Sequence, residues 1–153
     1  MFAGIGLVVI VGAAFGIIAS STSSNTNSPE GVTTAALANI ISGNHRALCK
    51  DFVPKYQARC RSGRRIAATG NFVVGISEIH GNKALVPIDA RLCTKVVGVK
   101  HITCQTYANS SSHLPSKTGQ DFFTVFSQGD TSSKSSYWLA PCRRINGHWY
   151  LAE

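Results

Sequence analysis

The stretch FVVGISEIHGNKALVPIDARLC, residues 72–93, holds two runs in which apolar side chains alternate with others, separated by Gly81-Asn82. A period of two is typical of β-strands, and a glycine beside an asparagine favours a tight turn. In the second run every other residue from 86 to 92 is apolar, whereas Asp89 and Arg91 lie on the opposite face. The stretch therefore predicts an antiparallel hairpin with one face in the core.

The residues before this hairpin carry the signals of helices. Ser28-Pro29-Glu30 supplies an N-cap, a proline at the first helical position and an acid in the first turn. This helix is expected to end at Gly43-Asn44, where the helical periodicity stops. Shorter helices are expected over residues 45–51 and 55–61.

The residues after the hairpin carry the signals of strands. Strands are expected over 120–127 and 136–145, after a Ser-rich loop over 109–119. The last run, 148–152, follows Asn146-Gly147, a pair that favours a type I′ hairpin. Helices followed by a meandering sheet predict an α+β fold, with the helices packed on one face of a curved, mostly antiparallel sheet.

The chain begins with an apolar segment, Phe2–Ala19, that contains no charged side chain. As a helix it would span roughly 27 Å, just enough to cross a hydrocarbon core. It is either a transmembrane signal anchor or the apolar region of a cleaved signal peptide. The anchor is favoured because no Lys or Arg precedes the segment and Ala19-Ser20-Ser21 is a poor cleavage site. Residues 20–28 are expected to be a polar linker and residues 29–153 the folded domain.

Four of the five cysteines are spaced for two local disulfides. Cys49 and Cys60 flank a predicted turn between helices, so a bridge would join those helices. Cys93 and Cys104 flank a stretch that folds naturally about Gly98-Val99, and a type II′ turn there places them directly opposite each other. Facing strand residues lie within disulfide range, so both bridges are expected.

The alternative is that all five thiols, including the leftover Cys142, are reduced and buried. We favour the disulfides, which persist only outside the reducing cytosol. They predict a domain on the extracytoplasmic side of the cell membrane, or a secreted domain if the apolar segment is cleaved. No CxxC motif occurs, and only His45 lies near a cysteine at ligand-like spacing, so no metal site is predicted.

The formal net charge is +8, and residues 50–65 hold six basic side chains and one acid. We define the basic patch as Lys50, Lys55, Arg59, Arg61, Arg64 and Arg65. Three interpretations are open: an ordinary solvated surface, contact with anionic lipid or cell-wall polymer, and contact with nucleic acid. Nucleic acid is the least favoured, because Tyr56 offers only a small stacking surface among these charges.

Three features together resemble the nuclear transport factor 2-like (cystatin-like) superfamily, in particular its small exported or membrane-anchored bacterial members. They are the opening SPEGVTTAALANIISGNHRALCKDFVP (28–54), the strand pair GISEIHGNKALVPIDARL (75–92) and the ending RINGHWYLAE (144–153). The resemblance covers residues 29–153. It implies a cone-like sheet and a pocket between sheet and helices, in which enzymes of this fold often place an Asp or His base and a Tyr donor.

The side chains that could reach such a pocket are Glu78, His80, Asp89, His148 and Tyr150. Each also fits a solvated face or ordinary packing, and a carboxylate beside an arginine, as Asp89 is, makes a poor general base. None of the familiar catalytic or nucleotide-binding motifs is present. No catalytic residue and no cofactor is therefore predicted.

The sequence favours a non-enzymatic, single-pass cell-envelope protein whose exported domain binds a ligand or a partner protein. Two alternatives remain open. One is an assembly subunit of a secretion or conjugation apparatus. The other is an exported isomerase or hydrolase that uses Glu78 or Asp89 as its base. The sequence indicates neither the ligand nor the oligomeric state.

Overall fold

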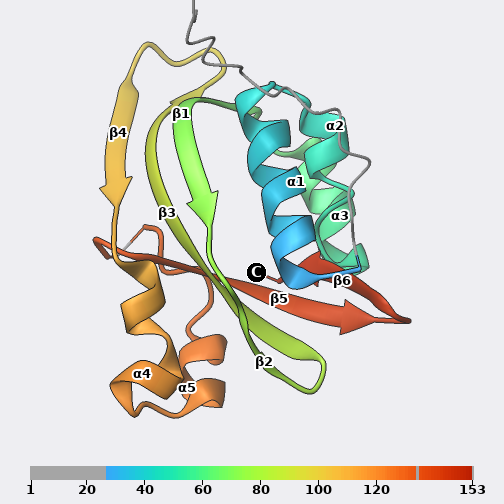
Figure 1. Cartoon of the computed structure of the whole chain (residues 1–153). Coiled ribbons are helices and arrows are strands. Elements are labelled where there is room, and N and C mark those ends of the chain that lie inside the picture. The colour runs from blue at the N-terminus through green and yellow to red at the C-terminus, as the bar shows by residue number, and fades with distance from the viewer. Residues whose placement is uncertain (1–26, 134, 153) are drawn as a thin grey trace, which may run out of the picture.

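The computed structural model describes residues 27–133 and 135–152, which form an α+β fold built on a curled antiparallel sheet (Figure 1). The elements are α1 (Pro29–Ile41), α2 (His45–Leu48), α3 (Pro54–Ser62), β1 (Ile66–Val74), β2 (Glu78–His80), β3 (Lys83–Val96), β4 (Ile102–Tyr107), the 3-10 helix η1 (Ser110–His113), α4 (Pro115–Thr118), α5 (Phe122–Ser127), β5 (Trp138–Ile145) and β6 (His148–Leu151).

The 14-residue strand β3 is the centre of the sheet. All of its partners are antiparallel: β1 and β2 pair along one edge, and β5 and β4 pair along the other. Strand β6 extends the sheet beyond β5, and the turn between them has positive φ at both Asn146 and Gly147, as a type I′ turn requires. The hairpins predicted at Gly81-Asn82 and Asn146-Gly147 are therefore confirmed.

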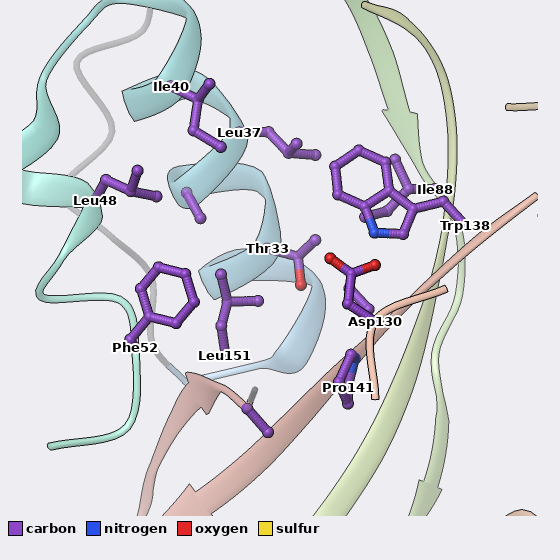
Figure 2. A pocket seen from close by; sticks show the side chains of 13 residues that line it. Thr33, Leu37, Ile40, Leu48, Phe52, Ile88, Asp130, Trp138, Pro141 and Leu151 are labelled. Carbon is purple, nitrogen blue, oxygen red and sulfur yellow. The ribbon is translucent and has the colours of Figure 1, made fainter. Parts of the chain in front are cut away.

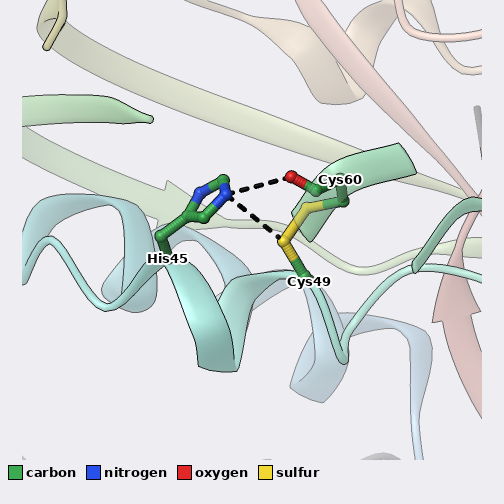
Figure 3. A group of neighbouring side chains, drawn as sticks. All are labelled: His45, Cys49 and Cys60. Carbon is green, nitrogen blue, oxygen red and sulfur yellow. Dashed lines mark hydrogen bonds between the residues drawn. A yellow bond between two sulfur atoms is a disulfide. The ribbon is translucent and has the colours of Figure 1, made fainter. Parts of the chain in front are cut away.

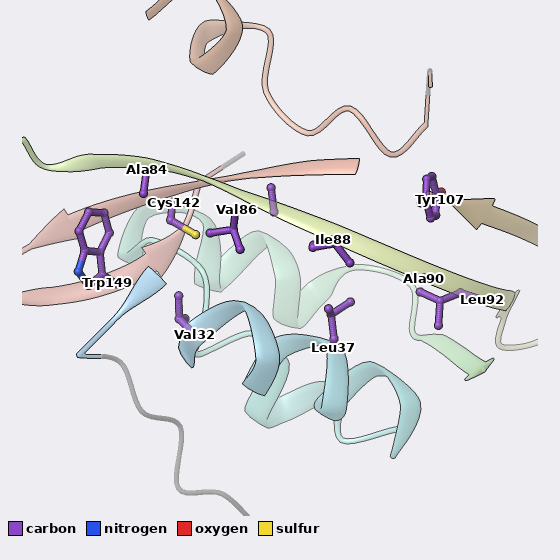
Figure 4. Packing of buried hydrophobic residues seen from close by; sticks show 11 residues of the cluster. Val32, Leu37, Ala84, Val86, Ile88, Ala90, Leu92, Tyr107, Cys142 and Trp149 are labelled. Carbon is purple, nitrogen blue, oxygen red and sulfur yellow. The ribbon is translucent and has the colours of Figure 1, made fainter. Parts of the chain in front are cut away.

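The core lies on both faces of β3. On the inner face, alternate residues such as Val86 and Ile88 pack against Val32 and Leu37 of α1 (Figure 4). On the outer face, Leu85 joins a second buried cluster with side chains of α5 such as Phe122. The two clusters together leave the first half of β3 without a solvent-facing side.

The prediction that the helices pack on one face of the sheet is wrong. Helices α1–α3 cover the inner face, but α4 and α5 cover the outer face at the end where β3 and β5 pair (Figure 1). The physical reason lies in the sequence of β3, where residues 84–88 are apolar on both faces. Such a strand needs cover on both sides.

The predicted strand over 120–127 is also wrong, because most of this stretch is helix α5. Asp121 caps the helix by accepting a hydrogen bond from Thr124 N–H at 2.8 Å. The buried side chains are Phe122, Val125 and Phe126, whose spacing of three and four is helical. Aromatic and β-branched residues are typical of strands, but here the helix N-cap and the helical spacing of the buried side chains outweigh that propensity.

The predicted fold class began with a transmembrane helix, and that prediction is corrected. No helix within residues 27–133 and 135–152 is long and apolar enough to cross a bilayer. The segment on which the prediction rested, Phe2–Ala19, lies outside the described residues.

The two expected cysteine pairs are confirmed as disulfides, Cys49–Cys60 and Cys93–Cys104. The Cys93–Cys104 pair faces across β3 and β4, as the register required. The turn itself differs from the expected one, because Val99 N–H donates to Val96 O and Gly98, with a φ of 89°, takes the third position. Cys142 is a free thiol buried in the inner core.

The helical layer is joined to the sheet at Asp51. Its backbone carbonyl accepts a hydrogen bond from Leu151 N–H at 2.7 Å, and Val53 N–H donates to the Leu151 carbonyl at 3.0 Å. The Asp51 side chain is buried and accepts a hydrogen bond from Asn39 Nδ2 at 2.9 Å. Burial raises the pKa of Asp51 to about 6, although the Asn39 bond favours the ionised form.

We expect Asp51→Asn to remove a loss of stability that the wild-type protein undergoes as the pH rises from about 4 to about 6. A carboxyl with a higher pKa in the folded than in the unfolded state binds its proton more tightly when folded, so stability falls as the pH rises from about 4 to about 6. The variant keeps an acceptor for Asn39 and has no proton to lose. The free energy of unfolding in urea should be compared between variant and wild type at about pH 4 and about pH 7.5. Relative to wild type, the variant should be on the order of 1 kcal/mol more stable at the higher pH than at the lower. If the difference in unfolding free energy between variant and wild type is the same at both pH values, the raised pKa of Asp51 is contradicted.

Candidate ligand pocket

A cavity of about 110 Å³ lies between α1 and the inner face of the sheet (Figure 2). Helix α1 contributes one wall, including Ala36, Leu37 and Ile40, and Ile88 of β3 is part of the opposite wall. Its remaining sides come from the α2–α3 region and from the last two strands. Because most of these side chains are aliphatic or aromatic, the cavity is suited to an apolar occupant.

Among the described residues that line this cavity, Asp130 is the one that ionises, and it faces Trp138. Although Asp130 is exposed as a residue, its carboxylate reaches inward from the loop before β5 (Figure 2). Burial raises the pKa of Asp130, and the hydrogen bond from Ser132 N–H at 2.8 Å and the nearby indole of Trp138 act in the opposite direction. The Trp138 Nε1 atom is buried and has no hydrogen-bond partner of good geometry among the described residues. One side of the cavity thus holds a carboxylate acceptor and an indole N–H that face each other.

Tyr107 stands next to this pair. Its hydroxyl lies 2.8 Å from the carbonyl oxygen of Ser132 and 2.6 Å from Gln105 Oε1, and it can donate to either. Its ring lies 5.2 Å from the ring of Trp138, centroid to centroid. Burial and the charge of Asp130 both raise the pKa of Tyr107. The phenol therefore remains protonated and supports the loop that carries Asp130.

The pocket residues expected from the sequence are not brought to this cavity. Glu78 accepts hydrogen bonds from Ser116 N–H at 3.0 Å and from His80, and although desolvation opposes them, these bonds lower the pKa of Glu78. The His80 ring stacks on Phe122 with centroids 4.1 Å apart. Both residues therefore fasten β2 to the helices of the outer face.

Asp89, His148 and Tyr150 also lie elsewhere. Asp89 is on the outer face of β3, where its carboxylate accepts a hydrogen bond from Ser110 N–H at 2.9 Å and holds η1. His148 and Tyr150 lie on β6, opposite Ile145 and Arg143 of β5. Neither contributes to the cavity wall.

The basic patch is exposed along the region from α2 to the start of β1. Its six residues are Lys50, Lys55, Arg59, Arg61, Arg64 and Arg65. Lys55 also lines an open groove of about 360 Å³ together with Tyr56, Phe126 and Arg143. The patch is thus continuous with a second hollow, which is larger than the cavity under α1.

His45, Cys49 and Cys60 form a compact cluster whose possible ligand atoms lie within 4.8 Å of one another (Figure 3). The two sulfur atoms are bonded to each other, which leaves no thiolate to bind a metal ion. The His45 Nε2 atom lies 3.0 Å from the Cys60 carbonyl oxygen. We interpret the cluster as a structural joint between α2 and α3.

Sequence reasoning missed Asp130 and Trp138 as site residues. They stand on different segments, a loop and a strand, and no motif or periodicity links them. The available signal was weak: Asp130 lies in a Gly-Asp-Thr turn, and Trp138 opens a strand that the sequence did predict. Only the curl of β3, which brings Ile88 opposite Trp138, shows that both line one cavity.

No family model matches this sequence, and no curated protein matches it. Among solved structures, the chain is similar to the solution structure of a SEC-C motif containing protein from Rhodopseudomonas palustris. The two share 13% sequence identity at a TM-score of 0.45, over 84% of this chain and 77% of the other. A likeness at this level carries no argument about function.

The fluorescence of Trp138 should report the ionisation of Asp130. We expect a pH titration of the native protein to show an emission change with a midpoint above about 4, the ordinary value for an aspartate, because burial raises the pKa. Asp130→Asn should abolish this change, while Asp121→Asn, which alters an exposed cap, should leave it. An identical titration in Asp130→Asn would show that the carboxylate does not act on the indole.

Proposed function

We propose that this chain provides an exported, non-enzymatic binding domain whose cavity holds a small, largely apolar molecule with one hydrogen-bond donor. The observation that carries the proposal is the pairing of an apolar cavity with the Asp130 carboxylate on its wall. Ligand sites are typically concave and apolar, with a few polar groups that fix orientation. The donor of the ligand would meet the Asp130 carboxylate, which faces Trp138 on the cavity wall.

The size of the cavity supports a small ligand. About 110 Å³ corresponds to the liquid volume of roughly four water molecules, well below the pockets that hold drug-sized compounds. The occupant is therefore a compact molecule, or the end of a longer one. The likeness to the nuclear transport factor 2-like superfamily, which we propose on the helical opening and the curled sheet, is consistent with a cavity in this position.

The two disulfides support export. Structural disulfides persist in oxidising compartments and are rare in the cytosol, and both pairs here close short loops between separate elements. We therefore propose that the folded domain works on the extracytoplasmic side of the membrane or in the medium.

An enzyme remains the second candidate, and one observation favours it. A partly desolvated carboxyl on the wall of an apolar cavity has the environment of a general base. The acids first considered for this role, Glu78 and Asp89, are occupied as hydrogen-bond acceptors for backbone N–H groups, so Asp130 replaces them in this alternative. A binding domain returns its ligand unchanged, whereas an enzyme does not.

Binding can be tested with benzylamine, which carries a donor, and toluene, which does not, by following amide chemical shifts. We expect both probes to shift residues around the cavity. Asp130→Asn should lower the affinity for benzylamine about tenfold, which corresponds to the loss of one charge-assisted hydrogen bond. The affinity for toluene should not change. Ala36→Leu, which fills the cavity from α1, should lower the affinity for both probes. Ala38→Leu, on the same helix, should lower the affinity for neither. Equal binding of both probes to Ala36→Leu and wild type would contradict the assignment.

Export can be tested by counting thiols in the protein isolated from its native cells. Alkylation of the denatured chain before reduction should add one label, at Cys142, and reduction should expose four more. Five labels before reduction would contradict an oxidising location. This outcome would leave the cavity assignment standing, so the two parts of the proposal fail separately.

A further inference from the structure

The end of the β3–β4 hairpin exposes aliphatic side chains. We define the hairpin tip as residues 96–101 with the flanking Ile66 and Ile102. The exposed fractions are 60% for Val97, 40% for Val99, 45% for Ile66 and 56% for Ile102. Single exposed apolar residues are ordinary on protein surfaces, but these four lie at one end of the sheet, at the top of Figure 1.

The tip is a fixed structure. Val99 N–H donates to Val96 O at 3.0 Å to close the turn, and Val97 N–H donates to Arg65 O at 2.9 Å, which joins the tip to the start of β1. The disulfide Cys93–Cys104 links the two strands just below it. Because the backbone is held in this way, the valines cannot bury themselves by local collapse.

Cations surround the tip. Lys95 precedes it on the hairpin, Lys100 lies within it, Arg64 and Arg65 precede β1 beside it, and all four are exposed. The sequence contains no acid between Asp51 and Glu78 or between Asp89 and Asp121, the two stretches that build this end of the molecule. The surface is therefore apolar at its centre and uniformly positive around it.

We propose that the hairpin tip docks on an anionic lipid bilayer. The aliphatic side chains would enter the boundary between headgroups and acyl chains, while the surrounding Lys and Arg would contact headgroup phosphates. A soluble polyanion would use the cations but gain nothing from exposed valines. Nucleic acid would require aromatic side chains for stacking, and the tip contains no Phe, Tyr or Trp and offers only the imidazole of His101. This inference does not depend on the ligand cavity or on how the first residues of the chain behave.

The test uses the full chain with a tryptophan introduced at the tip, Val97→Trp, and a matched control, Val73→Trp. Val73 lies at the other end of β1 and is similarly exposed, at 69%. Each variant is mixed with vesicles of phosphatidylglycerol and phosphatidylcholine that carry brominated acyl chains, which quench nearby tryptophan. Subtraction of the wild-type signal removes the native Trp138 and Trp149. Attachment of the chain through its apolar first residues would affect both variants alike.

We expect quenching at position 97 and little at position 73. Pure phosphatidylcholine vesicles, or about 1 M salt with a Debye length of about 3 Å, should remove most of it. Adding Lys95→Glu and Lys100→Glu to the Val97→Trp chain should raise the half-saturating lipid concentration about tenfold or more. Equal quenching at positions 97 and 73, no quenching at either, or equal quenching on neutral vesicles would each overturn the proposal.

Discussion

The whole fold depends on the burial of the first half of β3 from both faces. Leu85, Val86 and Ile88 are fully inaccessible to solvent, and each buried aliphatic side chain of this size stabilises the fold by about 1.5–3 kcal/mol. Neighbouring side chains on β3 point to opposite faces, so this burial requires a layer on each side. The inner layer is α1, and the outer layer is α5 with Leu114, the residue before α4. The apolar residues on both faces of β3 therefore require the outer helical layer as much as the inner one.

A proline in the middle of a central strand would normally break its ladder, and here the neighbouring strands accommodate it. Pro87 directs its carbonyl toward the β1–β2 edge, where it accepts a hydrogen bond from Gly75 N–H at 2.8 Å. The missing N–H of Pro87 faces the same edge, at the point where residues 75–77 leave the ladder between β1 and β2. Farther along, a Cβ on Gly70 would lie 2.0 Å from the Arg91 carbonyl oxygen, so the curl of β1 over β3 needs glycine at this position.

The sequence predicts best what depends on neighbouring residues. The Asn146-Gly147 turn, the N-cap at Ser28 and the facing of Cys93 with Cys104 are local features, and each is found in the structure. Helix α5 was missed because FFTVF has strand-forming composition, and its helical spacing matters only once a second core exists to receive it. The polar residues of the cavity were missed because Asp130 and Trp138 meet through the curl of the sheet, which no local pattern encodes.

The two disulfides hold the elements that the hydrophobic core does not. Helix α3 has no buried residue, and β4 buries only Tyr107, so neither element can be fixed by removing apolar surface from water. Cys60 fastens α3 to α2, and Cys104 fastens β4 to β3. These are also the elements that border the basic patch and the hairpin tip. Because a disulfide holds each element through one side chain, the other side chains of α3 and β4 can face the solvent. If the same elements were held by burial, those side chains would have to be part of the core. The exposure of these two surfaces and the oxidised cysteines therefore have one physical cause.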